Sequence, residues 1–139
     1  MTVNEVLNYN KIFKAIIDDN NDISALLKFK FLSACKQFEP VVSNFETVRE
    51  EKINQYSTNN SDGRVGIVPP VKEDYENDED YAKAQETFEK NIKMFSDDMN
   101  ELLASEADVE IKKFKASDVM DKGLSADYLV AIYDFIEEE

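Results

Sequence analysis

The chain contains no histidine, no tryptophan and only one cysteine among its 139 residues. The missing histidine excludes Ser-His-Asp and Cys-His catalytic arrangements and HExxH zinc sites, and it removes the commonest general base near neutral pH. The single cysteine, Cys35, excludes an internal disulfide, and its neighbours Leu32, Ala34 and Phe38 indicate a small packing residue rather than a reactive thiol. The sequence therefore predicts a protein that is not an enzyme and that holds no metal ion or cofactor.

Glycine and proline are also scarce, with three residues of each. So few turn formers argue against a many-stranded sandwich or barrel, and three scattered glycines cannot form a phosphate-binding loop. No stretch approaches the ~20 apolar residues that span a bilayer. The first residues lack the basic and apolar regions of a signal peptide. We therefore expect a mainly α-helical, intracellular protein with no membrane partner.

The formal charge of −14 is unevenly distributed. Residues 1–56 hold 7 Lys+Arg against 8 Asp+Glu, a net charge of −1, whereas residues 57–139 hold 9 against 22, a net charge of −13. Such a field repels nucleic acid and anionic membranes and favours basic protein surfaces. We expect a protein partner and no direct contact with nucleic acid, and self-association stays open.

Apolar spacing predicts two helices in the first 56 residues. A short extended piece at residues 2–6 is expected to precede a helix from Asn8 to Asp18. Ser24 can cap a much longer helix over about residues 24–56, whose apolar positions recur at helical spacing for about nine turns. Pro40 interrupts this pattern without changing its phase, which favours one kinked helix over two separate ones.

A third helix is predicted over about residues 78–104. Its seam advances in steps of four and three residues, as in a coiled coil: Tyr81, Gln85, Phe88, Ile92, Phe95, Met99 and Leu102. Because the preceding long helix carries a matching stripe, we predict a coiled-coil-like antiparallel hairpin of long helices with residues 57–77 as its linker.

After the hairpin, alternation over residues 109–114 predicts a short strand, whose expected partner is the N-terminal extended piece. Gly123 suits a left-handed position, and Ser125 can cap a last short helix. The predicted fold is therefore one domain, residues 1–139, mainly α, with flanking short helices and this minor β element.

The acidic segment DYENDEDY, residues 74–81, is the stretch most suggestive of chemistry. Aligned to the EF-hand calcium loop, it fails twice, because Glu79 stands at the glycine position and Gln85 at the bidentate glutamate. Asn77 or Asp78 can instead cap the third helix, with the following acids favoured by its dipole. What remains as a candidate partner-binding tip is Asp74, Tyr75 and Glu76, together with the apolar Ile67 and Val68 just before them.

The carboxylates could also imitate a nucleic-acid backbone. That role requires a long, unbroken acidic face, but Lys83, Lys90 and Lys93 interrupt the third helix. The pairs Glu86–Lys90 and Glu89–Lys93 have the spacing of ion pairs on an ordinary solvated helix. Mimicry is therefore kept as the alternative function rather than the leading one.

The start of the long second helix carries more apolar residues than one packing face needs. Leu26, Leu27, Phe29, Phe31 and Leu32 extend most of the way round it. Either the first and last helices pack there, or part of this surface is an interface, which makes Phe29 a further candidate partner-binding residue. Lys28 and Lys30 beside it form a basic-aromatic patch too small to indicate RNA binding.

The order of features resembles a family of short, acidic, uncharacterised proteins of tailed bacteriophages. The likeness covers the segments VNEVLNYNKIFKAI, ALLKFKFLSACKQFEPVVSNFETVREEKINQYS, DVEIKKF and GLSADYLVAIYDFIEEE. It implies a phage origin and a non-enzymatic role. Together with the absent catalytic residues, the surplus apolar surface and the uneven charge, it leads us to expect a protein of the host cytoplasm or the virion that acts by protein contact, as an assembly, adaptor or virion-associated component. Inhibition of a host nucleic-acid-binding or defence protein is the alternative. The family contributes no catalytic motif. The long-helix hairpin is also similar in outline to prefoldin subunits, at the level of fold alone.

Overall fold

The computed structural model describes residues 1–19, 22–120 and 123–137, and the chain is mainly helical as predicted. Its internal contacts divide it into two compact units. The first, here the core unit, comprises Met1–Ser43 and Ser105–Glu139; the second, the hairpin unit, comprises Asn44–Ala104. The expectation that residues 1–139 form a single domain stays a prediction.

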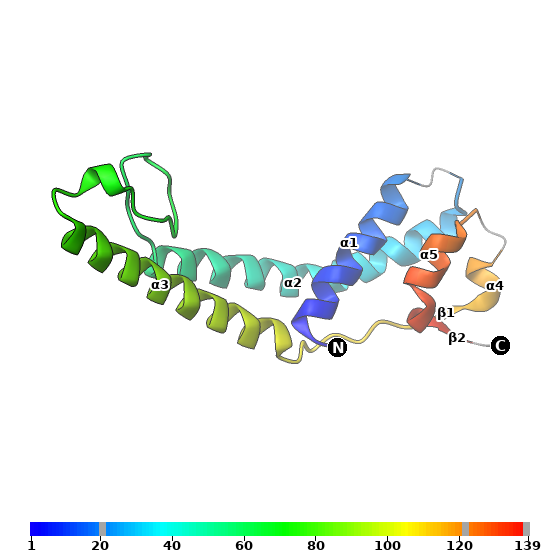
Figure 1. The fold of residues 1–139 in the computed structure, drawn as a ribbon. Coiled ribbons are helices and arrows are strands. Elements are labelled where there is room, and N and C mark those ends of the chain that lie inside the picture. The colour runs from blue at the N-terminus through cyan, green and yellow to red at the C-terminus, as the bar shows by residue number, and fades with distance from the viewer. Residues whose placement is uncertain (20–21, 121–122, 138–139) are drawn as a thin grey trace. The chain divides into compact units, whose positions relative to one another are not determined.

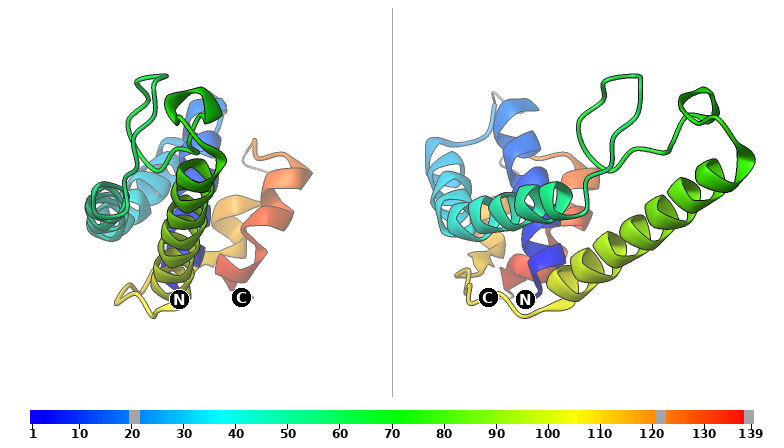
Figure 2. Two further views of the ribbon diagram at one scale, coloured as in Figure 1. Left: turned by 60° about the vertical axis from the view of Figure 1, so that its left-hand side comes forward. Right: turned by 90° about the vertical axis from the view of Figure 1, so that its left-hand side faces the viewer.

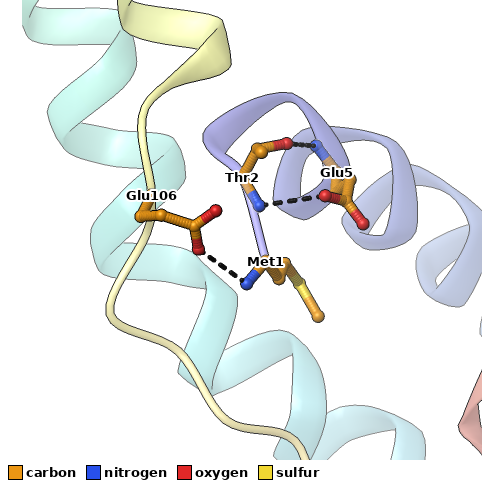
Figure 3. Close-up of polar contacts among 4 residues, drawn as sticks. All are labelled: Met1, Thr2, Glu5 and Glu106. Carbon is orange, nitrogen blue, oxygen red and sulfur yellow. Dashed lines mark hydrogen bonds and ion pairs between the residues drawn. The ribbon is translucent and has the colours of Figure 1, made fainter.

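Helix α1 spans Val3–Asp19, so the predicted extended piece at residues 2–6 is wrong. Thr2 and Glu5 explain the earlier start, because they bond reciprocally in a capping box (Figure 3). The Thr2 N–H donates to Glu5 Oε1 at 3.1 Å, and the Glu5 N–H donates to Thr2 Oγ1 at 3.2 Å. The hydrogen bond from the Thr2 backbone N–H to the Glu5 carboxylate lowers the pKa of Glu5, and the Thr2 side chain adds to the effect. The sequence TVNE carries this signal, which the alternation of Val3 and Glu5 had obscured.

The core unit is built on aromatic packing between α1 and the first half of α2, which spans Ala25–Gln55. Figures 1 and 2 show α1 lying across this half of α2, with the short helix α5 (Ala126–Ala131) beside α1. Phe13 is fully buried, and its ring centroid lies 5.2 Å from that of Phe31 and 5.6 Å from that of Phe38. Burial of such rings supplies most of the hydrophobic stabilisation of this unit.

Helix α2 begins where the sequence indicated. Ser24 caps it, since the Leu27 N–H donates to Ser24 Oγ at 3.2 Å, and the helix continues without a break through Pro40. Its ends lie within one residue of the predicted 24–56.

The minor β element forms with different partners from those predicted. Residues 109–113 adopt no regular secondary structure, and β1 (Phe114–Lys115) pairs in parallel with β2 (Ile136–Glu137). The N-terminal piece that was expected to pair with residues 109–114 forms the start of helix α1 instead. The N-terminus instead contacts the chain just after α3, through one antiparallel bridge between Thr2 and Glu106. There the N-terminal ammonium of Met1 lies 3.1 Å from Glu106 Oε2 (Figure 3).

Short elements complete the core unit. Helix α4 (Ala116–Val119) follows β1, and Ser125 caps α5 as predicted, accepting a hydrogen bond from the Tyr128 N–H at 3.4 Å. A 3₁₀ turn, η2 (Tyr133–Phe135), then leads into β2, so the last helix is shorter than its apolar pattern indicated.

The hairpin unit contains the last turns of α2, the linker with its 3₁₀ turn η1 (Lys72–Asp74), and helix α3 (Asp78–Ala104). Figure 1 shows α3 running antiparallel to this part of α2. Just past the end of α2, the Tyr56 carbonyl accepts a hydrogen bond from Asn91 Nδ2 at 3.2 Å. The end of α2 therefore lies near the middle of α3.

This register leaves the predicted coiled-coil seam incomplete. Of its seven members only Met99 is buried, five are half-buried, and Ile92 is 36% exposed. The hairpin itself is present, but residues 81–90 of α3 extend past the end of α2. The linker residues Val68, Pro70 and Tyr75 approach them instead.

Within the described residues, no helix is both long enough and apolar enough to cross a membrane.

Candidate functional site

The apolar part of the predicted binding tip is folded into the hairpin unit. The Val68 N–H donates to Thr58 Oγ1 at 2.8 Å, and the Thr58 hydroxyl donates to the Val68 carbonyl at 2.5 Å. Val68 is buried and Ile67 half-buried. The two residues therefore shape the linker, and they do not form the exposed apolar tip that the sequence suggested.

The acidic part of the tip is more accessible. Asp74 is exposed, and its Oδ2 accepts a hydrogen bond from the Ser61 N–H at 2.9 Å, which ties two parts of the linker together. The half-buried ring of Tyr75 makes an edge contact with Tyr81, with centroids 6.0 Å apart. Glu76 is exposed. The structure thus brings together five of the six candidates in the hairpin unit, whereas Phe29 belongs to the core unit.

Beside Tyr75, the linker and α3 enclose a hollow of about 230 Å³ that is also lined by Val68, Pro70 and Phe88. Its volume lies below the ~300–1,000 Å³ of typical small-molecule sites.

The acidic run begins α3 as predicted, because Asn77 caps the helix. Its Oδ1 accepts a hydrogen bond from the Asp80 N–H at 2.8 Å. The sequence also predicted two ion pairs on this helix, Glu86–Lys90 and Glu89–Lys93. Neither is among the ion pairs of the described residues. Lys83 pairs with Glu79 at 3.6 Å, and Lys93 pairs with Asp97 at 3.8 Å. Exposed side chains have several partners at helical spacing, so sequence alone does not select one.

No group of carboxylates or cysteine among the described residues is arranged to hold a metal ion. The carboxylates of the acidic run are exposed, and its last residues begin α3.

The start of α2 has two apolar sides with different environments. Leu27 and Phe31 are fully buried against the rest of the core unit. The other side carries Leu26, Phe29 and Leu32, which are 56%, 67% and 45% exposed and are here called the apolar ridge. The first reading, packing against other helices, therefore holds for the buried side of the helix, whereas an interface on the exposed side stays a prediction. Phe29 is the most exposed member of this ridge.

A groove next to Phe29 was not anticipated. It lies between α2 and the segment 111–115, has a volume of about 230 Å³, and is here called the basic groove. The lining includes Phe29, Lys30, Ile111, Lys112, Lys113 and Lys115. A signal was present in the sequence: residues 23–38 and 111–117 each hold three lysines and no Asp or Glu. Only the fold, however, brings these two distant segments together.

A second hollow in the core unit, of about 250 Å³, is lined by Asn10, Lys14, Leu32, Cys35 and others. Asn10 is buried, and its Oδ1 has no hydrogen-bond partner within the described part of the chain. Burial raises the pKa of the half-buried Cys35 thiol, and Lys14 partly offsets the increase. A raised pKa leaves less thiolate, which fits a packing role for this cysteine.

Comparison of the chain with protein-family models, with curated proteins and with solved structures finds no match in any of the three.

Proposed function

We propose that this protein acts by protein–protein contact, as an assembly, adaptor or virion-associated component of a tailed bacteriophage, without catalysing a reaction. The observation that carries the proposal is the apolar ridge of Leu26, Phe29 and Leu32, three large side chains exposed on one side of α2. An exposed cluster of this kind, bordered by polar residues, is typical of interaction sites. The absence of histidine from the chain also supports a role other than catalysis.

The aromatic centre of the ridge supports the same role. Phe29 is 67% exposed, and aromatic residues are enriched at the centres of protein interfaces, where they contribute most of the binding energy. A partner that covers Phe29 would remove this ring from water, and only its side-chain torsions would need to be ordered, since the helix already fixes its backbone. The expected location is the host cytoplasm or the virion, following the resemblance to phage proteins.

The test is a pull-down from phage-infected cells with the wild-type protein and with the variant Leu26→Ser/Phe29→Ser/Leu32→Ser. The variant is expected to lose a partner that the wild type captures. The control is Val65→Ser/Val130→Ser, which changes two exposed valines outside the ridge. Equal capture by all three proteins, or no partner for the wild type, would contradict the proposal. Mass spectrometry of purified virions then separates a virion component from a cytoplasmic one.

The second candidate function is inhibition of a host nucleic-acid-binding or defence protein by the acidic run. It is favoured by one observation: Asp74, Glu76, Asp78, Glu79 and Asp80 are all exposed. Charge reversal at these five positions distinguishes the candidates. Loss of a basic host partner would support inhibition, whereas unchanged capture together with loss in the ridge variant would support contact through the apolar ridge.

A further inference from the structure

We propose that the basic groove of one copy binds the acidic segment of residues 73–80 of a second copy, so that the protein associates with itself. This inference goes beyond the proposed function, because it concerns the lysines of the neighbouring groove, which shares only Phe29 with the apolar ridge, and needs only this chain. It rests on the charge of the groove, the charge and exposure of the acidic segment, and the size of the groove.

The groove is a local exception in an acidic protein. The chain carries a formal charge of −14, yet the groove is lined by four lysines, Lys30, Lys112, Lys113 and Lys115, and by no carboxylate. Lys30 is neutralised within the fold, since its Nζ lies 2.5 Å from Asp118 Oδ2. Lys112, Lys113 and Lys115 are exposed, and none of them has a carboxylate within 4.0 Å in the described residues. Three like charges on one short segment repel each other, and an anionic partner would relieve that repulsion.

The acidic segment has the opposite composition. Residues 73–80 hold six carboxylates and no basic residue, and all six carboxylates are exposed. Two lysines form long ion pairs with this segment: Lys72 Nζ lies 4.0 Å from Asp78 Oδ1, and Lys83 Nζ lies 3.6 Å from Glu79 Oε1. All four of these side chains are at least 70% exposed. Exposed pairs of this kind contribute little energy. The carboxylates of Glu73, Asp74 and Glu76 therefore stay accessible to the lysines of another molecule.

The size of the groove favours a short acidic segment over a nucleic acid. Its volume of about 230 Å³ accommodates one or two side chains, and Phe29 and Ile111 provide apolar walls for their carbon atoms. A nucleic acid presents a long, continuous array of phosphates. Such an array would extend past the three lysines and meet the surrounding carboxylates: residues 1–43 and 105–139 together hold 9 Lys and 15 Asp+Glu, a net charge of −6.

A charge-swap experiment tests the proposal. The groove variant is Lys112→Glu/Lys113→Glu/Lys115→Glu, and the segment variant is Glu73→Lys/Glu76→Lys/Asp78→Lys. All six positions are exposed, so folding is expected to be retained, which circular dichroism checks. Sedimentation equilibrium is expected to show oligomers of the 16.0 kDa wild type and monomers of each variant alone. A mixture of the two variants is expected to associate again, because each altered surface then faces one of opposite charge.

Salt provides a measurement that needs no variant. The dissociation constant of the wild-type oligomer is expected to rise at least about tenfold between ~50 mM and ~500 mM NaCl, because exposed charge pairs are screened at high salt. Carbodiimide cross-linking of a mixture of ¹⁴N and ¹⁵N protein is expected to join Lys112 or Lys113 of one isotope to Glu73 or Glu76 of the other. Cross-links confined to one isotope would overturn the proposal.

Two further results would also overturn it. The first is a wild-type protein that stays monomeric at ~50 mM NaCl, or a variant mixture that stays monomeric although both variants are folded. The second is binding of a fluorescent single-stranded oligonucleotide by the wild type, lost in the groove variant, with no self-association; the groove would then bind phosphates. Failure of either kind leaves the apolar ridge, and with it the proposed function, untouched.

Discussion

The hydroxyl of Tyr56 donates a hydrogen bond of 2.7 Å to Asp98 Oδ2, and so joins the residue after α2 to α3 within the hairpin unit. Lys52 Nζ lies 3.5 Å from the same oxygen, and its ammonium also lies 5.9 Å from the centroid of the Tyr56 ring. The three side chains form a cluster at the end of α2, where the incomplete seam provides few buried contacts. Tyr56 therefore helps to hold the register of the hairpin, through its hydroxyl and through its carbonyl.

Replacing Tyr56 with phenylalanine is expected to lower the denaturant midpoint of the protein. The ring still packs, but Asp98 loses a hydrogen bond to a charged acceptor, the stronger kind. Tyr56→Ala is expected to lower the midpoint further, because the buried ring is also lost. The control is Tyr133→Phe on an exposed tyrosine, which should leave urea unfolding unchanged. Equal midpoints for Tyr56→Phe and wild type would show that the hydroxyl does not hold the hairpin.

Phe13 is the centre of the aromatic core, with rings of four other phenylalanines within 6.0 Å of its own centroid. Phe13→Ala is expected to destabilise the protein by about 3–5 kcal/mol, through lost burial and the cavity left behind. Phe29→Ala, on the exposed ridge, is the matched control and should cost less than ~0.5 kcal/mol. Urea unfolding followed by circular dichroism measures both. Similar losses for the two variants would mean that Phe29 is packed in solution.

Gly123 has a φ of 90°, and a Cβ atom at this position would lie 2.9 Å from the Asp22 carbonyl oxygen. Gly63 has a φ of 71° with no atom within 4 Å of such a Cβ. Gly63→Ala is expected to cost about 1 kcal/mol for its backbone conformation alone. Gly123→Ala is expected to cost at least twice that amount, because the contact with Asp22 adds to it. Equal changes in melting temperature would indicate that the backbone at Gly123 shifts freely.

Asn10 places an unpaired acceptor in the core unit, and an unsatisfied buried polar group costs about 1–3 kcal/mol. Asn10→Leu, with a side chain of similar size, is therefore expected to raise the free energy of unfolding by about 1 kcal/mol. Asn8→Leu on the exposed side of α1 is the control and should bring no such gain. A loss of stability in Asn10→Leu would show that the amide has a partner in solution.

Three tyrosine hydroxyls donate to carboxylates: Tyr9 to Asp134, Tyr56 to Asp98 and Tyr128 to Asp19. Burial raises the pKa of Tyr9 above its ordinary value of 10.0, with Asp134 adding to the effect. The hydrogen bond to Asp98 raises the pKa of Tyr56, and the hydrogen bond to Asp19 raises the pKa of Tyr128. Because the folded state then binds these protons more tightly than the unfolded state, their contribution is complete below pH 10.0 and is lost as the pH rises further.

The measurement is the free energy of unfolding at several pH values on both sides of 10.0, for wild type and for Tyr9→Phe/Tyr56→Phe/Tyr128→Phe. The wild type is expected to lose more stability with rising pH than the triple variant, while lysine deprotonation affects both alike. Parallel curves would contradict the assignment. A spectrophotometric titration of the tyrosines should place three midpoints above those of the unfolded chain.

Local signals determined much of the fold. Ser24, Asn77 and Ser125 each cap the helix that the sequence assigned to them, because a cap depends only on residues within one turn. The boundaries of α2 and α3 follow from these caps and from long apolar stripes. The error at the N-terminus has the same local origin, since the capping box of Thr2 and Glu5 outweighs a two-residue alternation.

Which distant segments pair with each other could not be predicted from such local signals. The burial of residues 109–112 does alternate, with Val109 and Ile111 half-buried against the core. This pattern reports which side chains face inward and not which strand lies alongside. Likewise, the seam of α3 was recognised from its spacing, while its burial depends on where α2 ends relative to Asn91. Pairing partners and helix register depend on tertiary packing, which a one-dimensional pattern does not contain.

The sequence by itself determined the helical class, the caps, the exclusion of histidine chemistry and the uneven charge, because each depends on composition or on neighbours along the chain. The tertiary structure alone decided which apolar residues stay exposed, burying Leu27 and Phe31 and leaving Leu26, Phe29 and Leu32 outside. It also decided that two lysine segments about eighty residues apart form one groove. Both outcomes depend on which surfaces the chain brings into contact, and that is settled only when the whole core unit packs.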